Sequence, residues 1–358
     1  MSDLKNLLKN LPGKKYKSRY VLFLIDDYGN LRISGKEALN RLQKGGLQLS
    51  SRFDTLDALE TCDDFDALFE ILRCYRDAEG KHPVLTTYNL VANMNFEASV
   101  KAQEYIPESL SETYKRIHGD LKIRDYWRQG IDEELLSPEF HGREHLNVQA
   151  VNELFAADDT FLKLNIDNQS FAGIRPYGKS RIHPYASYDT NANSSVDDLI
   201  EITLDGLVRF EQEFGLQARA FAAPRGSDNV RLEECLSTHG IQMIDRQLIQ
   251  DGGAGKKLYY TGRKTKSGLT SYVRNCRFEP GMRKSGEEVK HTLDQIDACF
   301  TMRNIAIVSS HRANFSGGID EENRKQGLQD LNELLSAILS TWPDVRFLDL
   351  KGLGNILK

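Results

Sequence analysis

The sequence has little cysteine for its 358 residues, and the cysteines form no recognisable pattern. The five are Cys62, Cys74, Cys235, Cys276 and Cys299, and no two of them make a C-x-x-C pair. A sparse, odd set of this kind is typical of free thiols in a reducing compartment. Because none stands in a recognisable catalytic setting, we do not expect a cysteine nucleophile.

Long apolar runs and a basic excess are also missing. No stretch approaches the roughly 18 consecutive apolar residues that a membrane span needs. The first apolar run, 20–25, is too short for the core of a signal peptide. With 47 basic and 52 acidic residues, the net charge is −5, which does not attract nucleic acid or an anionic membrane. We therefore expect a cytoplasmic protein with no membrane span and no nucleic-acid partner.

What the sequence has is a regular alternation of two patterns. Short apolar runs predict strands at 20–25, 83–87, 135–140, 218–223, 241–245, 271–275, 304–310 and 345–350. Amphipathic segments predict helices at 63–77, 148–164, 196–214, 231–239, 287–302 and 321–341. This alternation is typical of an α/β fold around a mainly parallel sheet.

The length suits one catalytic barrel domain over residues 1–358, because single α/β barrels often reach this size. Two segments break the rhythm. Residues 165–195 are rich in Asn, Ser, Gly and Tyr, and residues 251–268 are rich in Gly and Lys. We expect both to be loop insertions on the barrel, where they can shape a substrate site.

Two adjacent acids, Asp26 and Asp27, follow the first predicted strand in the segment LIDDYGN. Adjacent side chains at a strand end diverge, so one can bind a metal while its neighbour acts as a base. Acids before Gly or Asn are also common in plain turns. The position favours a site, because barrel enzymes carry their chemistry at the carboxyl ends of the strands.

His141 and His145 follow another predicted strand, in PEFHGREHLNV. The H-x-x-x-H spacing places both imidazoles on one face of a helical turn, where they can share one metal ion. Two histidines and one carboxylate leave an open position, as a catalytic zinc requires. The same letters also read H-x-x-E-H, the inverted zinc-protease motif, with Glu144 as the base. That motif belongs inside a helix, whereas Pro138 and Gly142 indicate a strand-to-helix junction.

His311 ends the strongest late strand, in IVSSHRANFSGG, and suits a general acid because histidine titrates near neutrality. A plain strand cap is the alternative. Arg225, in FAAPRGSDN, is a candidate for orienting a carboxylate. Arg274, Arg277 and Glu279, in YVRNCRFEP, stand beside another strand end and are candidates for supporting the site or contacting substrate. All four charges fit surface ion pairs equally well.

The first insertion concentrates side chains that suit a sugar: Arg175, Tyr177, His183, Tyr185 and Tyr188. Aromatic rings stack on sugar rings, and arginine binds hydroxyl groups. Packing of the insertion onto the barrel explains the tyrosines equally well.

Taken in order, these residues resemble the polysaccharide deacetylases of the NodB-homology type (carbohydrate esterase family 4), in a divergent bacterial branch. The family's TFDDG motif corresponds to Leu24–Gly29, and its His-Ser/Thr-x-x-His motif to His141–His145, with Gly142 replacing the hydroxyl residue. Its Leu-x-His motif corresponds to Ser309–His311. The resemblance covers nearly the whole chain and implies a distorted (β/α)7-type barrel.

The resemblance also implies roles and an activity. Asp26 would be the general base, and His311 would protonate the leaving amine. Asp27, His141 and His145 would bind a divalent metal, most commonly zinc, with cobalt or nickel as alternatives. The implied reaction is the removal of an N-acetyl or O-acetyl group from a sugar or glycan intermediate.

Two motifs of the family are altered. At the expected place of Arg-x-Pro-Tyr/Phe, Ala222 replaces the arginine and Arg225 replaces the aromatic residue. Arg225 or another arginine must then orient Asp26. A second Arg-Pro-Tyr-Gly, at 175–178, lies in the insertion rather than after a strand and is interpreted either as a chance match or as a substrate loop. The Asp-Trp pair that supports the acid histidine is absent, and Asp245 is the nearest substitute.

These departures leave other functions open. One is a non-catalytic descendant of the fold that binds a carbohydrate, and another is an amidase acting on a non-sugar amide. If the protein is a cytoplasmic deacetylase, we expect a nucleotide sugar, a lipid-linked sugar or a short glycan as substrate.

Overall fold

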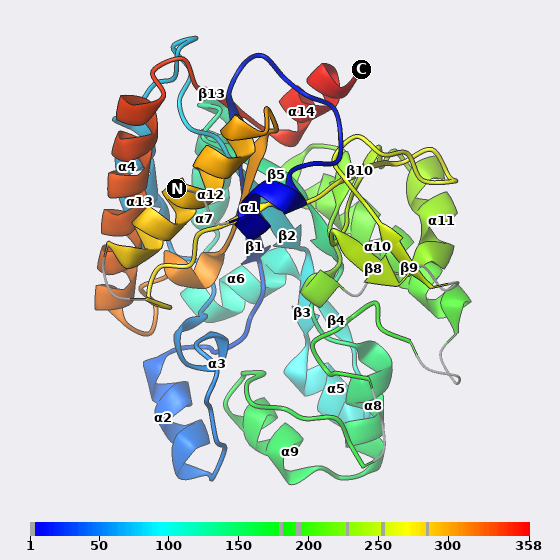
Figure 1. Ribbon diagram of the computed structural model, residues 1–358. Helices are drawn as coiled ribbons and strands as arrows, with labels where there is room; N and C mark the ends of the chain where they lie inside the picture. The colour runs from blue at the N-terminus through cyan, green and yellow to red at the C-terminus, as the bar shows by residue number, and fades with distance from the viewer. Residues whose placement is uncertain (1–3, 179–181, 191–194, 227–228, 252–254, 284–285) are drawn as a thin grey trace.

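The main sheet is parallel and curled, and helices cover its outer face (Figure 1). The computed structural model describes residues 4–178, 182–190, 195–226, 229–251, 255–283 and 286–358. The strands lie in the order β10–β7–β6–β5–β2–β1–β12–β11, and β13 also pairs with β1. This is the α/β half-barrel that the alternating pattern and the family resemblance predict.

The strand bounds agree with the predicted runs to within a few residues. They are β1 (Tyr20–Tyr28), β2 (Leu85–Leu90), β5 (Leu136–Gly142), β6 (Ala220–Phe221), β7 (Met243–Asp245), β10 (Thr270–Tyr272), β11 (Cys276–Arg277), β12 (Ala306–His311) and β13 (Arg346–Leu348). Every pair in this sheet is parallel. All the carboxyl ends therefore meet at one rim.

The two ends of the strand order belong to one short segment of chain. β10 pairs with β7, and β11, which begins four residues after β10 ends, pairs with β12. Between them, Asn275 donates its side-chain amide to the Ile305 carbonyl and accepts from the Ile307 amide, both at 2.8 Å. Residues 270–277 therefore join the two edges of the curled sheet, and the single strand predicted at 271–275 is divided between two partners.

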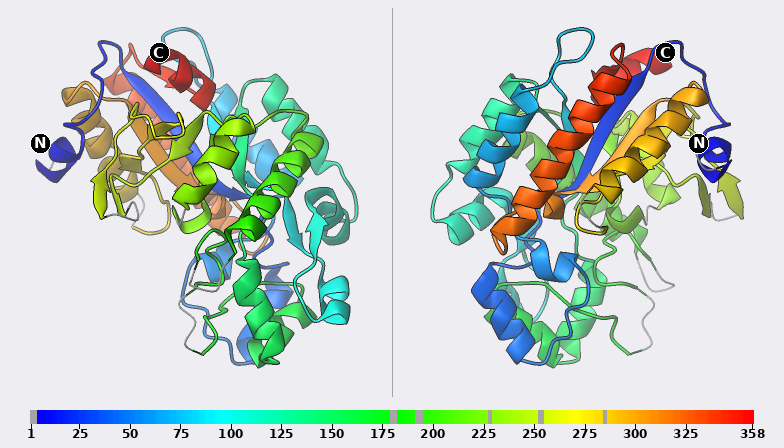
Figure 2. Two further views of the ribbon diagram at one scale, coloured as in Figure 1. Left: turned by 90° about the vertical axis from the view of Figure 1, so that its right-hand side faces the viewer. Right: turned by 60° about the vertical axis from the view of Figure 1, so that its left-hand side comes forward.

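The helices outside the sheet include α1 (Leu4–Lys9), α4 (Cys62–Arg73), α6 (Leu110–His118), α7 (Ile123–Asp132), α10 (Val196–Phe214), α11 (Glu233–Thr238), α12 (Glu287–Thr301), α13 (Glu321–Thr341) and α14 (Leu350–Leu357). α13 lies alongside α4 and α12 (Figure 2, right). Leu328, Leu331 and Leu335 of α13 are buried. Among the described residues, no helix has both the length and the hydrophobicity needed to cross a membrane.

A lobe that the sequence pattern did not predict stands beyond the carboxyl ends of the strands, at the bottom of Figure 1. It is built from the connections that follow β1, β2 and β5. Its elements are α2 (Lys36–Lys44), α3 (Phe53–Leu56), β3 (Ala92–Met94), α5 (Phe96–Ala102), β4 (Pro107–Ser109), α8 (Val148–Ala156) and α9 (Thr160–Asp167). Ile33, Leu42 and Ala172 belong to one buried cluster, which ties the first and third connections together.

The two predicted insertions differ in the structure. Beyond α9, the described residues of 165–195 contain no helix or strand. Within 251–268, β9 (Lys256–Leu258) pairs antiparallel with β8 (Ile249–Asp251), so this segment includes half of a small hairpin. The single helix predicted at 148–164 is two helices, because the side chain of Asp159 caps a new helix by accepting from the Leu162 amide.

Candidate metal centre

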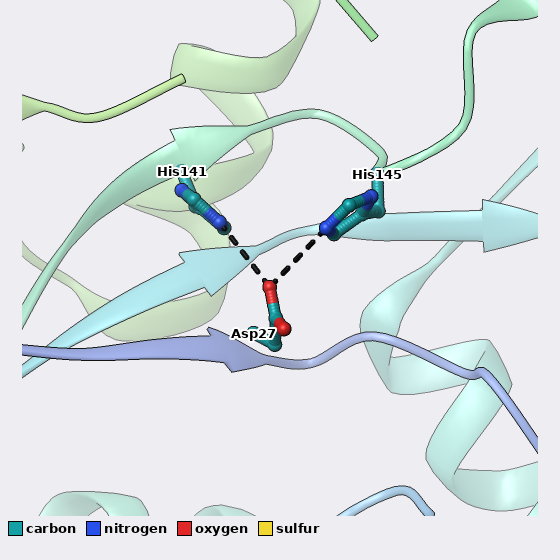
Figure 3. A group of neighbouring side chains, drawn as sticks. All are labelled: Asp27, His141 and His145. Carbon is teal, nitrogen blue, oxygen red and sulfur yellow. Dashed lines mark ion pairs between the residues drawn. The ribbon is translucent and has the colours of Figure 1, made fainter. Parts of the chain in front are cut away.

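Asp27, His141 and His145 converge at the carboxyl rim of the sheet (Figure 3). Nε2 of each histidine lies 3.3 Å from the same carboxylate oxygen, Oδ1 of Asp27. All three residues are buried. Among the described residues, this is the group whose His, Cys, Asp or Glu side chains are close enough to hold a metal, with ligand atoms within 4.8 Å of one another.

An irregularity in β1 lets two adjacent acids face one cavity. The register between β1 and β2 shifts between Ile25 and Tyr28, and Asp27 has a left-handed φ of 75°. In a regular strand, Asp26 and Asp27 would point to opposite faces, and a bulge is the usual way to redirect a side chain. Both carboxylates therefore line the same cavity. The left-handed residue costs about 1 kcal/mol or more, which the surrounding structure must offset.

His141 is prepared for metal binding by its second nitrogen. Its Nδ1 lies 2.7 Å from the carbonyl oxygen of Ala222, so Nδ1 carries the proton. Nε2 is then the nitrogen that faces Asp27 and is left to bind a metal. Such a hydrogen bond is the usual support of a metal-binding histidine.

His141 and His145 do not share a helical turn, and that expectation was wrong. His141 ends β5, and His145 lies in the loop before α8. Gly142 between them has a φ of 125°, which keeps the chain out of a helix. A Cβ on Gly142 would lie 3.0 Å from the ring of Tyr188, so a side chain there would require that ring to shift.

The chemistry of this group fits a divalent cation. Burial alone raises the pKa of Asp27, but His145 and His141 outweigh it and hold the pKa well below its usual range. The carboxylate is thus ionised beside two imidazoles, one with a fixed tautomer. Two nitrogens and one oxygen are the donor set of a catalytic zinc site.

The arginine beside Asp26 is Arg274, which the sequence analysis held only as a supporting candidate. Nη1 and Nη2 of Arg274 donate to the two carboxylate oxygens of Asp26, at 2.5 and 2.9 Å. Nε of Arg274 also lies 2.8 Å from Asp245. Burial raises the pKa of Asp245 to about 6, although Arg274 opposes the shift. Arg225 is exposed and makes no described bond to Asp26, so it does not orient that carboxylate.

His311 is held by Glu279 rather than by Asp245. Nδ1 of His311 lies 2.5 Å from Oε1 of Glu279, and the ring of Phe53 lies edge-on to the imidazole. Burial lowers the pKa of His311, but the hydrogen bond and charge of Glu279 outweigh it, and with Asp27 and Asp26 they raise the pKa to about 9. His311 is therefore cationic at neutral pH.

Glu279 and Arg277 do not reach the cavity as the proposed substrate contacts. Glu279 is buried and also accepts from Arg52 and Asn314, at 3.0 and 2.9 Å. Neither Glu279 nor Arg277 is among the residues that line the cavity. The carboxylate of Glu279 is therefore fully engaged in holding His311. The prediction of a substrate contact failed because a strand-end position does not by itself decide which way a side chain points.

The cavity over the metal group, here called the mouth cavity, has a volume of about 620 Å³. It lies between the rim of the sheet and the lobe. Asp26, Asp27, His141, His145 and His311 all line it. The five residues that the family resemblance assigned to catalysis and metal binding are thus brought to one place.

The aromatic residues of the first insertion divide into two groups. Tyr185 and Tyr188 are buried, and Arg32 stacks on the ring of Tyr185 at 3.8 Å, so these two rings pack the insertion onto the barrel. Tyr177 is exposed and lines a neighbouring cavity of about 450 Å³. Arg175 lines both cavities.

Glu144 does not fit the protease interpretation. It is buried and paired with Arg143, whose Nε donates to its carboxylate at 2.6 Å. It does not line the mouth cavity, and the helix that the inverted motif requires is not present at 141–145.

No protein-family model matches the sequence. No curated protein matches it either. Among solved structures, the Puue allantoinase has a TM-score of 0.50 at 10% identity, over 97% of this chain and 92% of that one. A GH57-type branching enzyme from the hyperthermophilic archaeon Pyrococcus horikoshii has a TM-score of 0.50 at 10% identity, over 96% and 71%. A protein of Mycobacterium smegmatis named as a polysaccharide deacetylase has a TM-score of 0.47 at 11% identity, over 97% and 91%.

The two structures with a TM-score of 0.50 show that this chain shares their fold. Their names denote different activities, and one fold commonly supports several. The function of this chain must therefore be argued from its own site.

Proposed function

We propose that the protein is a metal-dependent hydrolase that removes an acetyl group from an N-acetylated or O-acetylated sugar. The observation that carries the proposal is the arrangement of the mouth cavity. The open group of Asp27, His141 and His145 shares this cavity with a carboxylate, Asp26, and an imidazole, His311. A base and an acid beside one metal group are what hydrolysis of an acyl bond requires.

Asp27, His141 and His145 are the residues that would hold the metal. A divalent ion bound there supplies Lewis acidity, which activates water and polarises an acyl carbonyl. Zinc suits this donor set best, and cobalt or nickel also fit it.

Asp26 acts as the general base. Its carboxylate accepts a proton from the attacking water, while the two-pronged contact with Arg274 fixes its orientation. Asp245 fixes Arg274 in turn. Ala222 stands where the family's Arg-x-Pro-Tyr/Phe motif has its arginine. Arg274 takes the place of that arginine beside Asp26.

His311 acts as the general acid. Glu279 holds its Nδ1, so Nε2 is the nitrogen that delivers a proton to the leaving group. An amine leaving group needs this proton more than an alcohol does, because an amide nitrogen departs poorly as an anion. This argument favours an N-acetyl substrate.

The test begins with metal content. We expect elemental analysis of purified protein to find about one zinc, cobalt or nickel per chain, and Asp27→Ala and His145→Ala to lose it. His82→Ala is the matched control, because His82 lies before β2, at the opposite end of the barrel. Wild-type protein that takes up no metal, even with zinc added, would overturn the proposal.

Turnover is tested next, by the release of acetate from N-acetylated and O-acetylated sugars and from a simple non-sugar amide. Acetate release from a sugar, lost in Asp27→Ala and kept in His82→Ala, supports the proposal. Metal binding with no turnover of any acyl sugar would leave a carbohydrate-binding protein. Turnover of the non-sugar amide alone would identify an amidase.

A further inference from the structure

The acidic side chains of the mouth cavity are already engaged. Four carboxylates line it. Their partners are Arg274 for Asp26 and Asp245, Arg32 for Asp54, and His141 with His145 for Asp27. Because these acids and their partners are paired with one another, a charged side chain that is free to bind a substrate must come from other residues of the cavity.

Two arginines supply that charge. Arg175 and Arg225 line the cavity and are exposed, and neither makes a hydrogen bond or ion pair within the part of the chain that the structure describes. Arg225 also has a left-handed φ of 58°, a strained conformation that sets the direction of its side chain. His183 stands nearby with Nδ1 accepting from the Tyr185 amide at 3.2 Å, so its Nε2–H is available as a donor. The cavity that holds the metal group thus also offers uncommitted donors.

The neighbouring cavity, here called the side cavity, continues from this point. It shares Gln48, Gly173 and Arg175 with the mouth cavity. Two large rings line it with much of their surface exposed, Phe161 at 46% and Tyr177 at 50%. Exposed aromatic rings beside a cavity offer faces on which a planar ligand group can stack.

The side cavity also holds an acceptor. Asp159 is its one carboxylate among the described lining residues, and the Leu162 amide fixes it at 2.8 Å. A carboxylate held in this way suits the hydroxyl groups of a ribose. Arg175, which lines both cavities, therefore links the metal group and Arg225 of the mouth cavity with the carboxylate and the two rings of the side cavity.

We propose that the substrate is a nucleoside diphosphate sugar. Its acyl sugar lies at the metal group, its phosphates meet Arg175 and Arg225, and its base stacks on Phe161 and Tyr177. Planar guanidinium groups bind phosphate through paired hydrogen bonds, and aromatic side chains stack on any base. The assignment of the acyl sugar as the part that reacts rests on the proposed function. The assignment of the phosphate and nucleobase sites does not.

Binding tests those sites without catalysis. The probes are UDP and ADP, measured by calorimetry on the full-length wild-type protein with and without added zinc. We expect Arg175→Ala and Arg225→Ala each to weaken binding about tenfold, as loss of a charged hydrogen bond does, and Phe161→Ala to weaken it about fivefold or more. Arg128→Ala, at an exposed arginine of α7, is the matched control and should bind as wild type does.

Turnover then separates this inference from the proposed function. We expect UDP-N-acetylglucosamine to release acetate at least tenfold faster, by kcat/KM, than the neutral disaccharide N,N′-diacetylchitobiose. UDP or ADP binding that depends on Arg175, with no acetate released from any sugar, would uphold the nucleotide site and remove the hydrolase. Turnover of N,N′-diacetylchitobiose with no UDP or ADP binding would uphold the hydrolase and remove the nucleotide site. Preference for an N-acetylated uronic acid, again without UDP or ADP binding, would show that the arginines serve a carboxylate and would overturn the inference.

Discussion

The two ends of the barrel each have a cavity, and the larger of the two does not hold the candidate metal group. The cavity at the amino ends of the strands, here called the base cavity, has a volume of about 1070 Å³, against about 620 Å³ for the mouth cavity. The base cavity holds both charges and a histidine, but its buried acid, Glu139, is satisfied by the backbone amides of Arg219 and Ala220 at 2.7 and 2.8 Å. Volume alone therefore does not identify a site, and the mouth cavity is distinguished instead by the group of Asp27, His141 and His145 that could hold a metal.

The difference follows from the connections at each end. At the carboxyl rim, the chain leaves β1, β2 and β5 by long excursions that build the lobe. These excursions enclose the rim and bring side chains from distant segments over it. At the amino ends, the cavity is lined mainly by residues just before β2, β5, β6 and β7, and no excursion of comparable size covers it.

The largest expected contrast comes from one acid-to-amide change at each end. Asp26→Asn should lower kcat by about 10²- to 10⁴-fold, because the general base is lost, while metal content stays unchanged. Glu139→Gln should alter kcat by less than about twofold, because Glu139 lies outside the mouth cavity. Acetate release and elemental analysis on both variants provide the measurement. Equal losses in the two variants would refute the assignment of the mouth cavity as the site.

The next effect isolates the orientation of the base. Arg274→Lys keeps one positive charge beside Asp26 and Asp245 but loses the two-pronged contact. We expect kcat to fall by about 10- to 100-fold with little change in KM. Thermal unfolding controls for damage to the fold. Wild-type kcat in a stable Arg274→Lys protein would show that Arg274 contributes charge alone.

A smaller effect concerns pH. The pKa of His311 is raised to about 9, mainly through Glu279 against the effect of burial, so the acid form predominates below that pH and is lost above it. In Glu279→Gln the pKa should fall toward its ordinary value, and the alkaline limb of kcat should move to lower pH by about 1–2 units. A bound divalent cation would lower the pKa of His311 in the wild type and in the variant alike. The quantity to measure is therefore the difference in pH between their two alkaline limbs. If the alkaline limb of kcat does not move in Glu279→Gln, the limb reports the titration of a group other than His311.

The smallest effect is on stability at the other end. Burial raises the pKa of Glu139 from its ordinary 4.5 to about 8. The folded protein therefore binds this proton more tightly than the unfolded chain does, and the associated stability is lost as pH rises from about 4.5 to 8. Glu139→Gln should flatten the fall in Tm over that range, by an amount corresponding to roughly 1–3 kcal/mol. Parallel Tm curves for variant and wild type would contradict the shift.

The residues of the candidate site could be predicted from the sequence better than the residues that hold them in place. Asp27, His141 and His311 were predictable because each follows an apolar run, and the carboxyl ends of parallel strands meet at one rim. The partner of Asp26 was not predictable in this way, because Arg274 lies 248 residues away along the chain. Such a contact depends on how the sheet closes, which no local pattern encodes.

The lobe was missed for a different reason. The helices for which no prediction was made are short: α2 has nine residues, α3 has four and α5 has seven. Segments of this length complete too few turns to show a helical period in the sequence. The helical turn predicted for His141 and His145 failed because spacing alone does not reveal a glycine at φ 125°.

The segment 270–277 has a consequence for the order of folding. Arg274 lies at the joint where this segment leaves β7 and reaches β12. If the sheet from β1 to β7 forms before this segment docks, Asp27, His141 and His145 come together while Asp26 still has no arginine beside it. The proposed metal binding and the proposed hydrolysis would then begin at different times during refolding, and the start of hydrolysis would report the closure of the sheet.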